Sequence, residues 1–340
     1  MLEFKKYSSI ENTYNRDFVE QVMAEMPTDL QFVVQEKVHG TNVSFLCNGN
    51  DIQFAKRTSI VSDDENFYDY KELLKDYSER VSRLFVNVKT RYPDVRSISV
   101  FGEMFGGLYP HPDVPHIKQL TTIQKSIFYT PKHEFYGFDI YIFTENDEKY
   151  LTVNETNEIF EQENFLYAKT LMQGSLTECL EYPNSFESLI PKELGLPLIE
   201  GNICEGVVIR PLEPKFLRNG TRVLIKNKNK KFAEKKNIWK HLAVENQEYS
   251  KELQVLIDEI TCFITENRLN NVISHIGEVK MPHDFGKTIG LFAKDCLEDF
   301  LKEYGKAYEN LEKMEQKQLN KELNRLSTEL IKRAFSRSNL

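Results

Sequence analysis

The sequence Glu36-Lys37-Val38-His39-Gly40-Thr41-Asn42 follows an apolar run, Phe32-Val33-Val34, that is typical of a β-strand. Lys37 is therefore predicted to end a strand, just before a turn that contains glycine. Such a lysine can act as a nucleophile if burial or neighbouring cations lower the pKa of its amine toward neutrality. A lysine with a glycine three residues later also occurs at Lys192 and at Lys302, so this motif alone indicates little.

Charged and aromatic residues also recur within or beside other predicted strands, where charge is disfavoured unless a polar cleft receives it. One such carboxylate would mean little, but several strands that each contribute one group predict a shared nucleotide pocket. Lys226 and Lys228 are two residues apart on a strand, so they share a face. In chain order, the segments that contain these charged and aromatic residues are Lys56-Arg57-Thr58, Phe101-Gly102-Glu103, Tyr136-Gly137-Phe138-Asp139, Glu205-Gly206-Val207-Val208-Ile209 and Leu224-Ile225-Lys226-Asn227-Lys228.

The chain changes character near residue 243. Before it, strand and helix patterns are mixed without strict alternation, which argues against a doubly wound parallel sheet. Helical stretches are predicted at residues 67–88 and 155–165. Beyond it, apolar residues at helical spacing predict three amphipathic helices, at residues 253–264, 289–300 and 319–330. We expect two domains, residues 1–243 and 244–340.

Composition excludes several classes of protein. A net charge of −8 argues against a uniformly basic nucleic-acid-binding protein. The five cysteines are widely spaced without a CxxC pair, which disfavours a structural zinc site and a disulfide framework. No apolar run reaches the length of a signal peptide or of a membrane span. We therefore expect a soluble, monomeric protein of a reducing compartment, the cytoplasm (the host cytoplasm if the protein is viral).

One segment departs from the acidic balance. Ten lysines and arginines lie between Lys215 and Lys240, and only Glu234 opposes them. A solvated charged face is the commoner meaning of such a run. The shared face of Lys226 and Lys228, with Trp239 nearby, favours a site for a polyanion instead.

Taken in order, these motifs resemble those of the covalent nucleotidyltransferases, the superfamily of ligases and capping enzymes. Within it they are most similar to the RNA ligase 2 family of phages (double-strand RNA ligases), whose relatives include the kinetoplastid RNA-editing ligases. The form Lys-x-His-Gly-Thr-Asn points there, since DNA ligases and capping enzymes usually have aspartate where this chain has His39. The likeness also covers residues 4–9, 217–220, 267–274, 276–278 and 284–287.

The resemblance implies an α+β fold, in which an ATP-grasp-like nucleotidyltransferase domain has antiparallel sheets lining a cleft. A small all-helical domain follows and helps to grip the 3′-OH side of a nick. The implied activity is that of an ATP-dependent RNA ligase. Lys37 takes AMP from ATP, AMP passes to an RNA 5′-phosphate, and a 3′-OH then expels AMP. The implied substrate is RNA, with nicked duplexes favoured, and Mg²⁺ (or Mn²⁺) is the implied ion. No protein partner is expected.

The resemblance also assigns roles at the nucleotide. Lys37 is the expected nucleophile, and Lys226 and Lys228 would neutralise the phosphates as charge develops. Glu36 would help to recognise adenine, and Phe138 would stack on it. The remaining residues implied at the nucleotide are Asn42 where nucleotide and RNA meet, Arg57 at a phosphate, and Glu103 and Glu205 at the ribose or at a divalent ion.

Four residues are implied at the RNA: His39, Arg57, Arg218 and Arg268. Simpler roles stay open for three of the site residues. Phe138 could belong to the core, His39 could satisfy its turn, and Arg268 could pair with helix carboxylates.

Two other functions stay open as well. An RNA end-binding protein, or an inactive relative of the ligases, would keep the fold without sealing activity. A DNA ligase or capping enzyme is disfavoured because an OB-fold usually follows the last lysine motif of those enzymes, whereas helices are predicted here.

Overall fold

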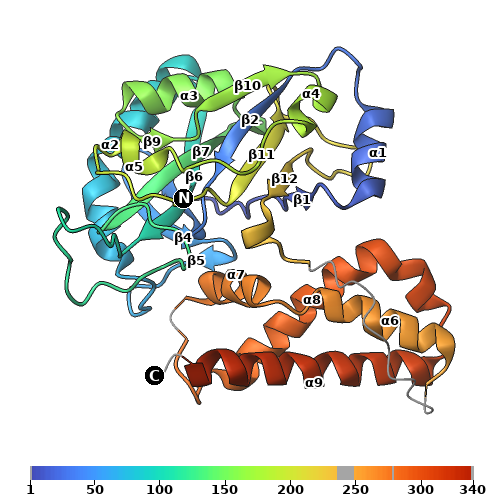
Figure 1. Cartoon of the computed structure of the whole chain (residues 1–340). Helices are drawn as coiled ribbons and strands as arrows, with labels where there is room; N and C mark the ends of the chain where they lie inside the picture. Colours follow the sequence, from blue (N-terminus) through green and yellow to red (C-terminus); the bar gives the residue numbers. More distant parts are fainter. Residues whose placement is uncertain (1, 236–248, 278, 338–340) are drawn as a thin grey trace. The chain divides into compact units, whose positions relative to one another are not determined.

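A computed structural model describes residues 2–235, 249–277 and 279–337 of the chain (Figure 1). The chain forms two compact units, Met1–Lys231 and Phe232–Leu340. The first is α+β and the second is helical, as predicted. The expected domain boundary at residues 243 and 244 lies outside the described residues, as do Lys236, Trp239 and Lys240 of the basic segment and Glu278 of a matched motif.

Two β-sheets form the centre of the first unit. The five-stranded sheet has the order β1 (Glu11–Asn12), β12 (Ile225–Lys228), β11 (Gly206–Pro211), β2 (Phe32–Lys37), β10 (Thr170–Gly174). The seven-stranded sheet has the order β5 (Ser59–Ile60), β4 (Ile52–Lys56), β3 (Thr41–Cys47), β6 (Val95–Gly106), β7 (His133–Thr144), β8 (Glu148–Tyr150), with β9 (Leu166–Tyr167) paired to β7. All pairs are antiparallel except β1 with β12 and β7 with β9. This confirms the predicted antiparallel sheets.

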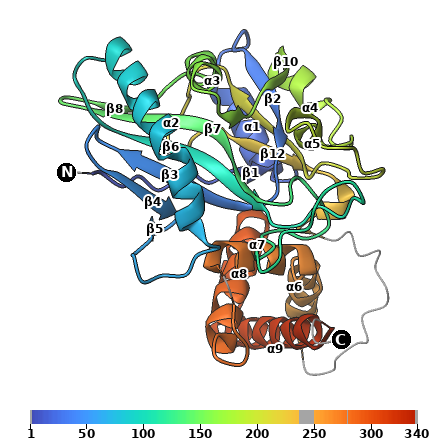
Figure 2. The ribbon, with the colours of Figure 1, turned by 90° about the vertical axis from the view of Figure 1, so that its left-hand side faces the viewer.

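Helices cover the outer faces of the sheets. They are α1 (Arg16–Glu25), α2 (Tyr70–Arg91), α3 (Val153–Gln162), α4 (Leu176–Leu180) and α5 (Ile190–Glu193). Figure 2 shows α2 crossing the seven-stranded sheet. Its buried side chains recur at spacings of three or four residues, from Tyr70 to Val88, and pack on β3, β6 and β7 in one apolar core. A second core joins α1 and α4 to β2 and β11.

Strand alternation decides which residues of the five-stranded sheet point inward, toward the other sheet. Phe32 of β2 packs outward against α1 and α4, so Lys37, an odd number of residues later, points inward. Ile225 of β12 also packs outward, so Lys226 and Lys228 point inward. The sheet therefore turns three lysines toward the space between the sheets.

The seven-stranded sheet presents a complementary inner face. Val43 of β3 and Val100 of β6 pack outward on α2, so Asn42 and Glu103 point inward. Asn42 and Glu103 are direct cross-strand partners. The two sheets together thus place carboxylate, amide and ammonium groups between them.

The second unit is entirely helical within its described residues. A short 3₁₀ turn, η1 (Lys230–Phe232), precedes α6 (Lys251–Cys262), α7 (Glu266–Ile276), α8 (Phe285–Glu309) and α9 (Lys313–Arg337). Apolar residues of the four helices share one core. The helices α6, α8 and α9 correspond to the three predicted amphipathic segments. Helix α7 was not predicted, because its apolar positions are few and its polar residues were read only as a matched motif.

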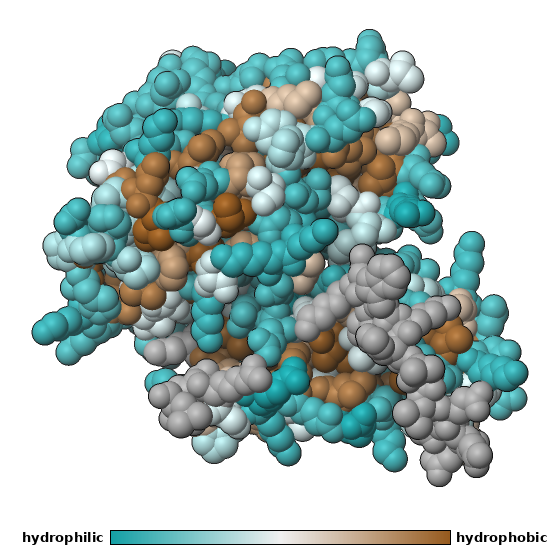
Figure 3. Space-filling view, in the orientation of Figure 1, coloured by the Kyte–Doolittle hydropathy of each residue, from teal (hydrophilic) through white to brown (hydrophobic). Residues whose placement is uncertain are grey.

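Apolar side chains are largely internal. On the face shown in Figure 3, hydrophilic side chains surround the apolar patches. Within residues 2–235, 249–277 and 279–337, no helix combines the length and the apolarity needed to cross a membrane.

Candidate active site

Lys37 belongs to a buried cluster of opposite charges. Its Nζ lies 2.9 Å from Oε2 of Glu205, and Nζ of Lys228 lies 2.5 Å from Oε1 of the same carboxylate. The side chains are 16%, 1% and 6% exposed for Lys37, Glu205 and Lys228. One carboxylate thus holds two lysines, from β2 and β12, the strands on either side of β11. These three residues were predicted to share a site, and the structure brings them together.

Gly206 makes this arrangement possible. It follows Glu205 and has a φ of +146°, where a Cβ would lie 2.2 Å from the carbonyl oxygen of Asn227. Only glycine lets β11 approach β12 so closely at this point. As a result, Glu205 reaches Lys228, whose register partner is Gly206.

The two carboxylates of the site differ in protonation. Burial alone would raise the pKa of Glu205, but Lys228, Lys37 and His39 together lower it to about 2. Burial raises the pKa of Glu103 to about 7, with support from Glu205 and against the opposing effect of Lys37. One carboxylate is therefore ionised across the neutral range, while the other titrates within it.

His39 lies beside the cluster in the turn after β2. Its Nδ1 is 3.8 Å from Oε2 of Glu205, and its backbone N–H donates to the hydroxyl of Tyr129 at 2.9 Å. The turn packs tightly, because a Cβ on Gly40 would lie 2.3 Å from the carbonyl oxygen of Met104. His39 thus lies beside the charged cluster and also completes a fixed turn. Tyr129, which the sequence analysis did not single out, anchors that turn.

Phe138 occupies a β-bulge. The register of β6 and β7 shifts between the pairs Phe101–Asp139 and Gly102–Gly137, which leaves Phe138 as the extra residue. Bulges redirect side chains and occur near active sites. The ring is only partly buried and lies 5.0 Å from the ring of Tyr7. Phe138 therefore has one side supported by the core and some surface left for a ligand.

Asp139, next to Phe138, is fully buried and ties the two sheets together. It accepts hydrogen bonds from Tyr7 at 2.8 Å, Arg210 at 2.7 Å and Arg222 at 2.8 Å. Burial alone would raise its pKa, but the two guanidinium groups hold the pKa below the ordinary value. Arg210 also donates to the carbonyl oxygen of Phe138 at 2.9 Å. Neither Arg210 nor Arg222 was predicted to belong to the site, because their partner Asp139 lies more than 70 residues away in the sequence.

Glu36 does not join this cluster. It lies on the outer side of β2, where its carboxylate accepts hydrogen bonds from Ser188 Oγ at 2.6 Å and from the Leu189 backbone at 3.0 Å. Burial, opposed by these two hydrogen bonds, raises its pKa to about 7. The contact of Glu36 with adenine stays a prediction. The segment that contains Ser188 had no signal in the sequence that could connect it to Glu36.

Glu36 gives a pH-dependent stability with a definite sign. Its pKa rises from 4.5 in the unfolded chain to about 7, so the folded state binds more protons between these values. The free energy of unfolding should therefore fall as the pH rises from 5 to 7. Glu36→Gln should flatten this decline by up to roughly 3 kcal/mol. Urea unfolding at a series of pH values measures it, with the exposed Glu145→Gln as control. Equal slopes in both variants would contradict the assignment.

The three arginines predicted at RNA or phosphate lie in different places. Arg57, in the turn after β4, reaches toward Ser9 at 3.4 Å and contributes to the electrostatics of Glu103. Arg218 is exposed in a turn that lies beyond one end of β11 and β12, and Lys37 lies at the other end of these strands. Arg268 is buried in the helical unit.

Arg268 pairs with two carboxylates of α8. Its guanidinium lies 2.6 Å from Asp295 and 2.8 Å from Asp299. This geometry favours the alternative in which Arg268 stabilises the helical unit. A direct contact with RNA stays a prediction.

The site fits a nucleotide and a divalent ion. Asn42 Oδ1, on the inner face of β3, is buried without a hydrogen-bond partner among the described residues, so a polar group is available for a ligand. Within the same residues, no group of three or more potential metal ligands occurs. Mg²⁺ commonly binds through one or two carboxylates together with the phosphates of a nucleotide. Glu103 and Glu205 could supply these carboxylates.

A strand-end lysine that faces buried carboxylates and a second lysine, between two mainly antiparallel sheets, is the arrangement expected of an ATP-dependent nucleotidyltransferase of the ligase class. The family model described as RNA ligase matches residues 30–228, and the model described as T4 RNA ligase 2 C-terminal matches residues 245–329. The chain therefore belongs to the RNA ligase family. These matches confirm the predicted resemblance and the ATP-dependent ligase activity.

Two curated relatives come from Trypanosoma brucei brucei. The mitochondrial RNA-editing ligase 1 is 30% identical over 331 residues, covering 80% of this chain and 70% of that protein. The mitochondrial RNA-editing ligase 2 is 25% identical over 351 residues, covering 88% of this chain and 83% of that protein. Among solved structures, a Naegleria gruberi RNA ligase variant has a TM-score of 0.46 and 17% identity. That match covers 68% of this chain and 59% of the Naegleria chain.

Proposed function

We propose that this RNA ligase seals nicks in duplex RNA through a covalent Lys37–AMP intermediate. The observation that supports this most directly is the position of Lys37, at a strand end and 2.9 Å from the buried Glu205. In the first step, the neutral amine of Lys37 attacks the α-phosphorus of ATP. An N–P bond forms, and the bond to the pyrophosphate oxygen breaks.

The two carboxylates suit different parts of this step. Lys37 must lose a proton before it attacks. Without a bound ion, Glu103, with a pKa of about 7, is better matched to receive a proton near neutral pH than Glu205, with a pKa of about 2, whereas an ion bound to Glu103 would lower its pKa. Glu205 instead fixes Lys37 and Lys228 in place. A divalent ion held by these carboxylates and by phosphate oxygens would neutralise charge on the phosphates.

The two later steps need positive charge on the inner face of the five-stranded sheet, where Lys37 lies. AMP passes from Lys37 to the 5′-phosphate of the RNA, and the 3′-OH then attacks that phosphate and releases AMP. Lys226 and Lys228 lie on the inner face of β12 and are placed to stabilise the developing negative charge. We propose that the helical unit contributes to binding the 3′-OH side of the nick.

The preference for nicks is tested with two substrates that share the same RNA ends. One is a nicked RNA duplex with a radiolabelled 5′-phosphate, and the other is the same two strands without the complementary strand. We expect sealing of the nick to be at least roughly tenfold faster, because the complementary strand holds the ends together. A nick with a 5′-hydroxyl is the control. Equal rates on both substrates would refute nick specificity while leaving ligase activity intact.

A further inference from the structure

A pocket of about 520 Å³ lies in the first unit, lined by residues from the N-terminal segment, β7, β8, α3 and the turn before β12. Its volume is that of a site for a small organic group. Aromatic residues form much of its wall, among them Tyr141, Tyr150 and Phe216. Phe216 is 49% exposed, so an apolar ring stands open to solvent at the pocket. None of the residues assigned to the nucleotide lines it.

The aromatic wall is rigid. The rings of Tyr141 and Tyr150 meet edge to face with centroids 4.6 Å apart. The guanidinium of Arg222 lies 3.5 Å from the centre of the Tyr150 ring, and Ser8 Oγ lies 3.3 Å from the Tyr150 hydroxyl. These contacts hold Tyr150 in one orientation and also cover its ring, which is 6% exposed. Tyr150 therefore gives the pocket a fixed wall, and the exposed ring of Phe216 is the face that is open for stacking.

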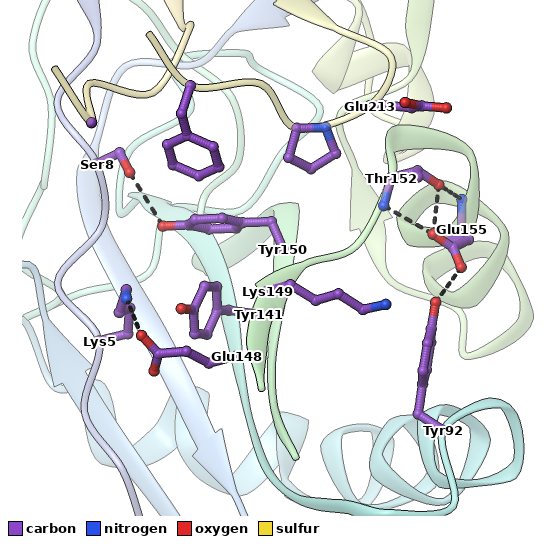
Figure 4. A pocket seen from close by; sticks show the side chains of 13 residues that line it. Lys5, Ser8, Tyr92, Tyr141, Glu148, Lys149, Tyr150, Thr152, Glu155 and Glu213 are labelled. Atoms are coloured by element: carbon purple, nitrogen blue, oxygen red, sulfur yellow. Dashed lines mark hydrogen bonds and ion pairs between the residues drawn. The ribbon is translucent and has the colours of Figure 1, made fainter. Parts of the chain in front are cut away.

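The charges at the pocket are mixed. Lys5 lies 4.6 Å from the centre of the Tyr141 ring and 2.9 Å from Glu148. Lys149 is exposed, and Figure 4 shows it reaching into the space between Tyr141 and Tyr92. Glu213 also lines the pocket. Such a balance suits a base, with carboxylates for its amino groups and a lysine for one backbone phosphate, better than a cluster of phosphates.

The pocket lies well away from Lys37. Phe216 and Gly220 flank the turn that precedes β12, beyond the Pro211 end of β11, whereas Lys37 pairs with Gly206 at the other end. Six residues of β11 separate the two ends by roughly 17 Å. That distance corresponds to several nucleotides of RNA. Arg218 lies in the same turn and is exposed.

We propose that this pocket binds an unpaired base of the RNA strand, several nucleotides from the nick. The inference rests on the proposed function, since it takes RNA as the substrate. The exposed ring of Phe216 supplies the stacking surface, and Tyr150 supplies a fixed wall beside it. Lys149 and Arg218 are placed for the adjoining backbone. The ligase would then prefer nicked duplexes that carry a single-stranded extension over duplexes that end flush.

The test compares two nicked RNA duplexes, one with flush ends and one with a single-stranded extension, by fluorescence anisotropy on the full chain. The wild-type protein should bind the extended duplex at least about fivefold more tightly, since stacking on an aromatic side chain contributes this much or more per base. Phe216→Ala should lose this advantage. Val86→Ala, at an exposed apolar position on α2 that does not line the pocket, should keep it.

Two further measurements keep the outcome unambiguous. Lys37 labelling by ATP should be unchanged in Phe216→Ala, which shows that the variant is folded and that its nucleotide site is intact. A 4-thiouridine in the extension should crosslink to the segment around Phe216 or Tyr150. Equal affinities of the wild-type protein for both duplexes, or crosslinks only elsewhere, would overturn the proposal. Loss of labelling in the wild-type protein would instead refute the proposed function.

Discussion

Replacing Lys37 by alanine should abolish the transfer of AMP from ATP to the protein. The amine of Lys37 is the only proposed acceptor, and removal of a covalent nucleophile typically lowers the rate by a factor on the order of 10⁴ or more. The measurement uses α-³²P-labelled ATP with Mg²⁺, after bound AMP has been discharged with pyrophosphate. The wild-type protein should give a labelled band on a denaturing gel, and Lys37→Ala should give none.

Lys192→Ala is a matched control. Lys192 also precedes a glycine by three residues, but it lies exposed on α5 rather than at a strand end between the sheets. Its replacement should leave labelling unchanged. Label that persists in Lys37→Ala would exclude Lys37 as the nucleophile. A folded, AMP-free wild-type protein that takes up no label would favour the RNA end-binding function instead.

The charged cluster could be predicted because each of its residues stands out within its own short stretch of sequence. A charged residue in an apolar strand needs a reason, and Lys37, Glu205 and Lys228 each stand at such a point. Strand alternation then fixes their direction, which is why Lys226 and Lys228 could be placed on one face before the fold was known. The structure adds that Glu205 bridges two of the lysines.

The ends of helices were predictable only to within a few residues. Helix α2 begins at Tyr70 rather than at Phe67, because Tyr68 and Asp69 adopt φ values of 48° and 50° that a helix does not allow. Helix α3 begins two residues earlier than predicted because Thr152 and Glu155 form a capping box. It ends before the predicted Phe165, since Asn164 has a φ of 57°.

The supporting contacts could not be predicted, because they join distant parts of the chain. Ser188 lies 152 residues from Glu36, and Tyr7 lies 132 residues from Asp139. Periodicity and motif spacing contain no information on such pairs. For the same reason, the place of Arg218, beyond the far end of the strands from Lys37, could not be predicted, and its contact with RNA stays a prediction. The carboxylate partners of Arg268 on α8 favour its structural role, and its contact with RNA stays a prediction.

The second large effect should follow from Asp139→Ala, which we expect to lower the stability of the first unit by about 3–5 kcal/mol. Asp139 accepts hydrogen bonds from Arg210 and Arg222, which are 2% and 3% exposed. Without the carboxylate, two buried guanidinium groups would repel each other with no counterion. Thermal unfolding followed by circular dichroism measures the change.

Asp113→Ala makes the same chemical change at an exposed position of the same unit and should alter stability by no more than about 0.5 kcal/mol. If Asp139→Ala were no worse than this control, the ion pairs between the sheets would contribute nothing to stability. The pairs would then have to be explained by positioning alone.

Positioning makes a separate and measurable contribution. Arg210 holds both Asp139 and the carbonyl oxygen of Phe138, so a change at Asp139 should also disturb the bulge that presents the Phe138 ring. Asp139→Asn keeps the shape of the side chain but removes its charge. Where that variant is still folded, it should bind ATP more weakly than the wild-type protein. A variant that is less stable but binds ATP normally would show that the buried pairs hold the sheets together without orienting Phe138. Weakened binding would connect the packing between the sheets directly to recognition of the nucleotide.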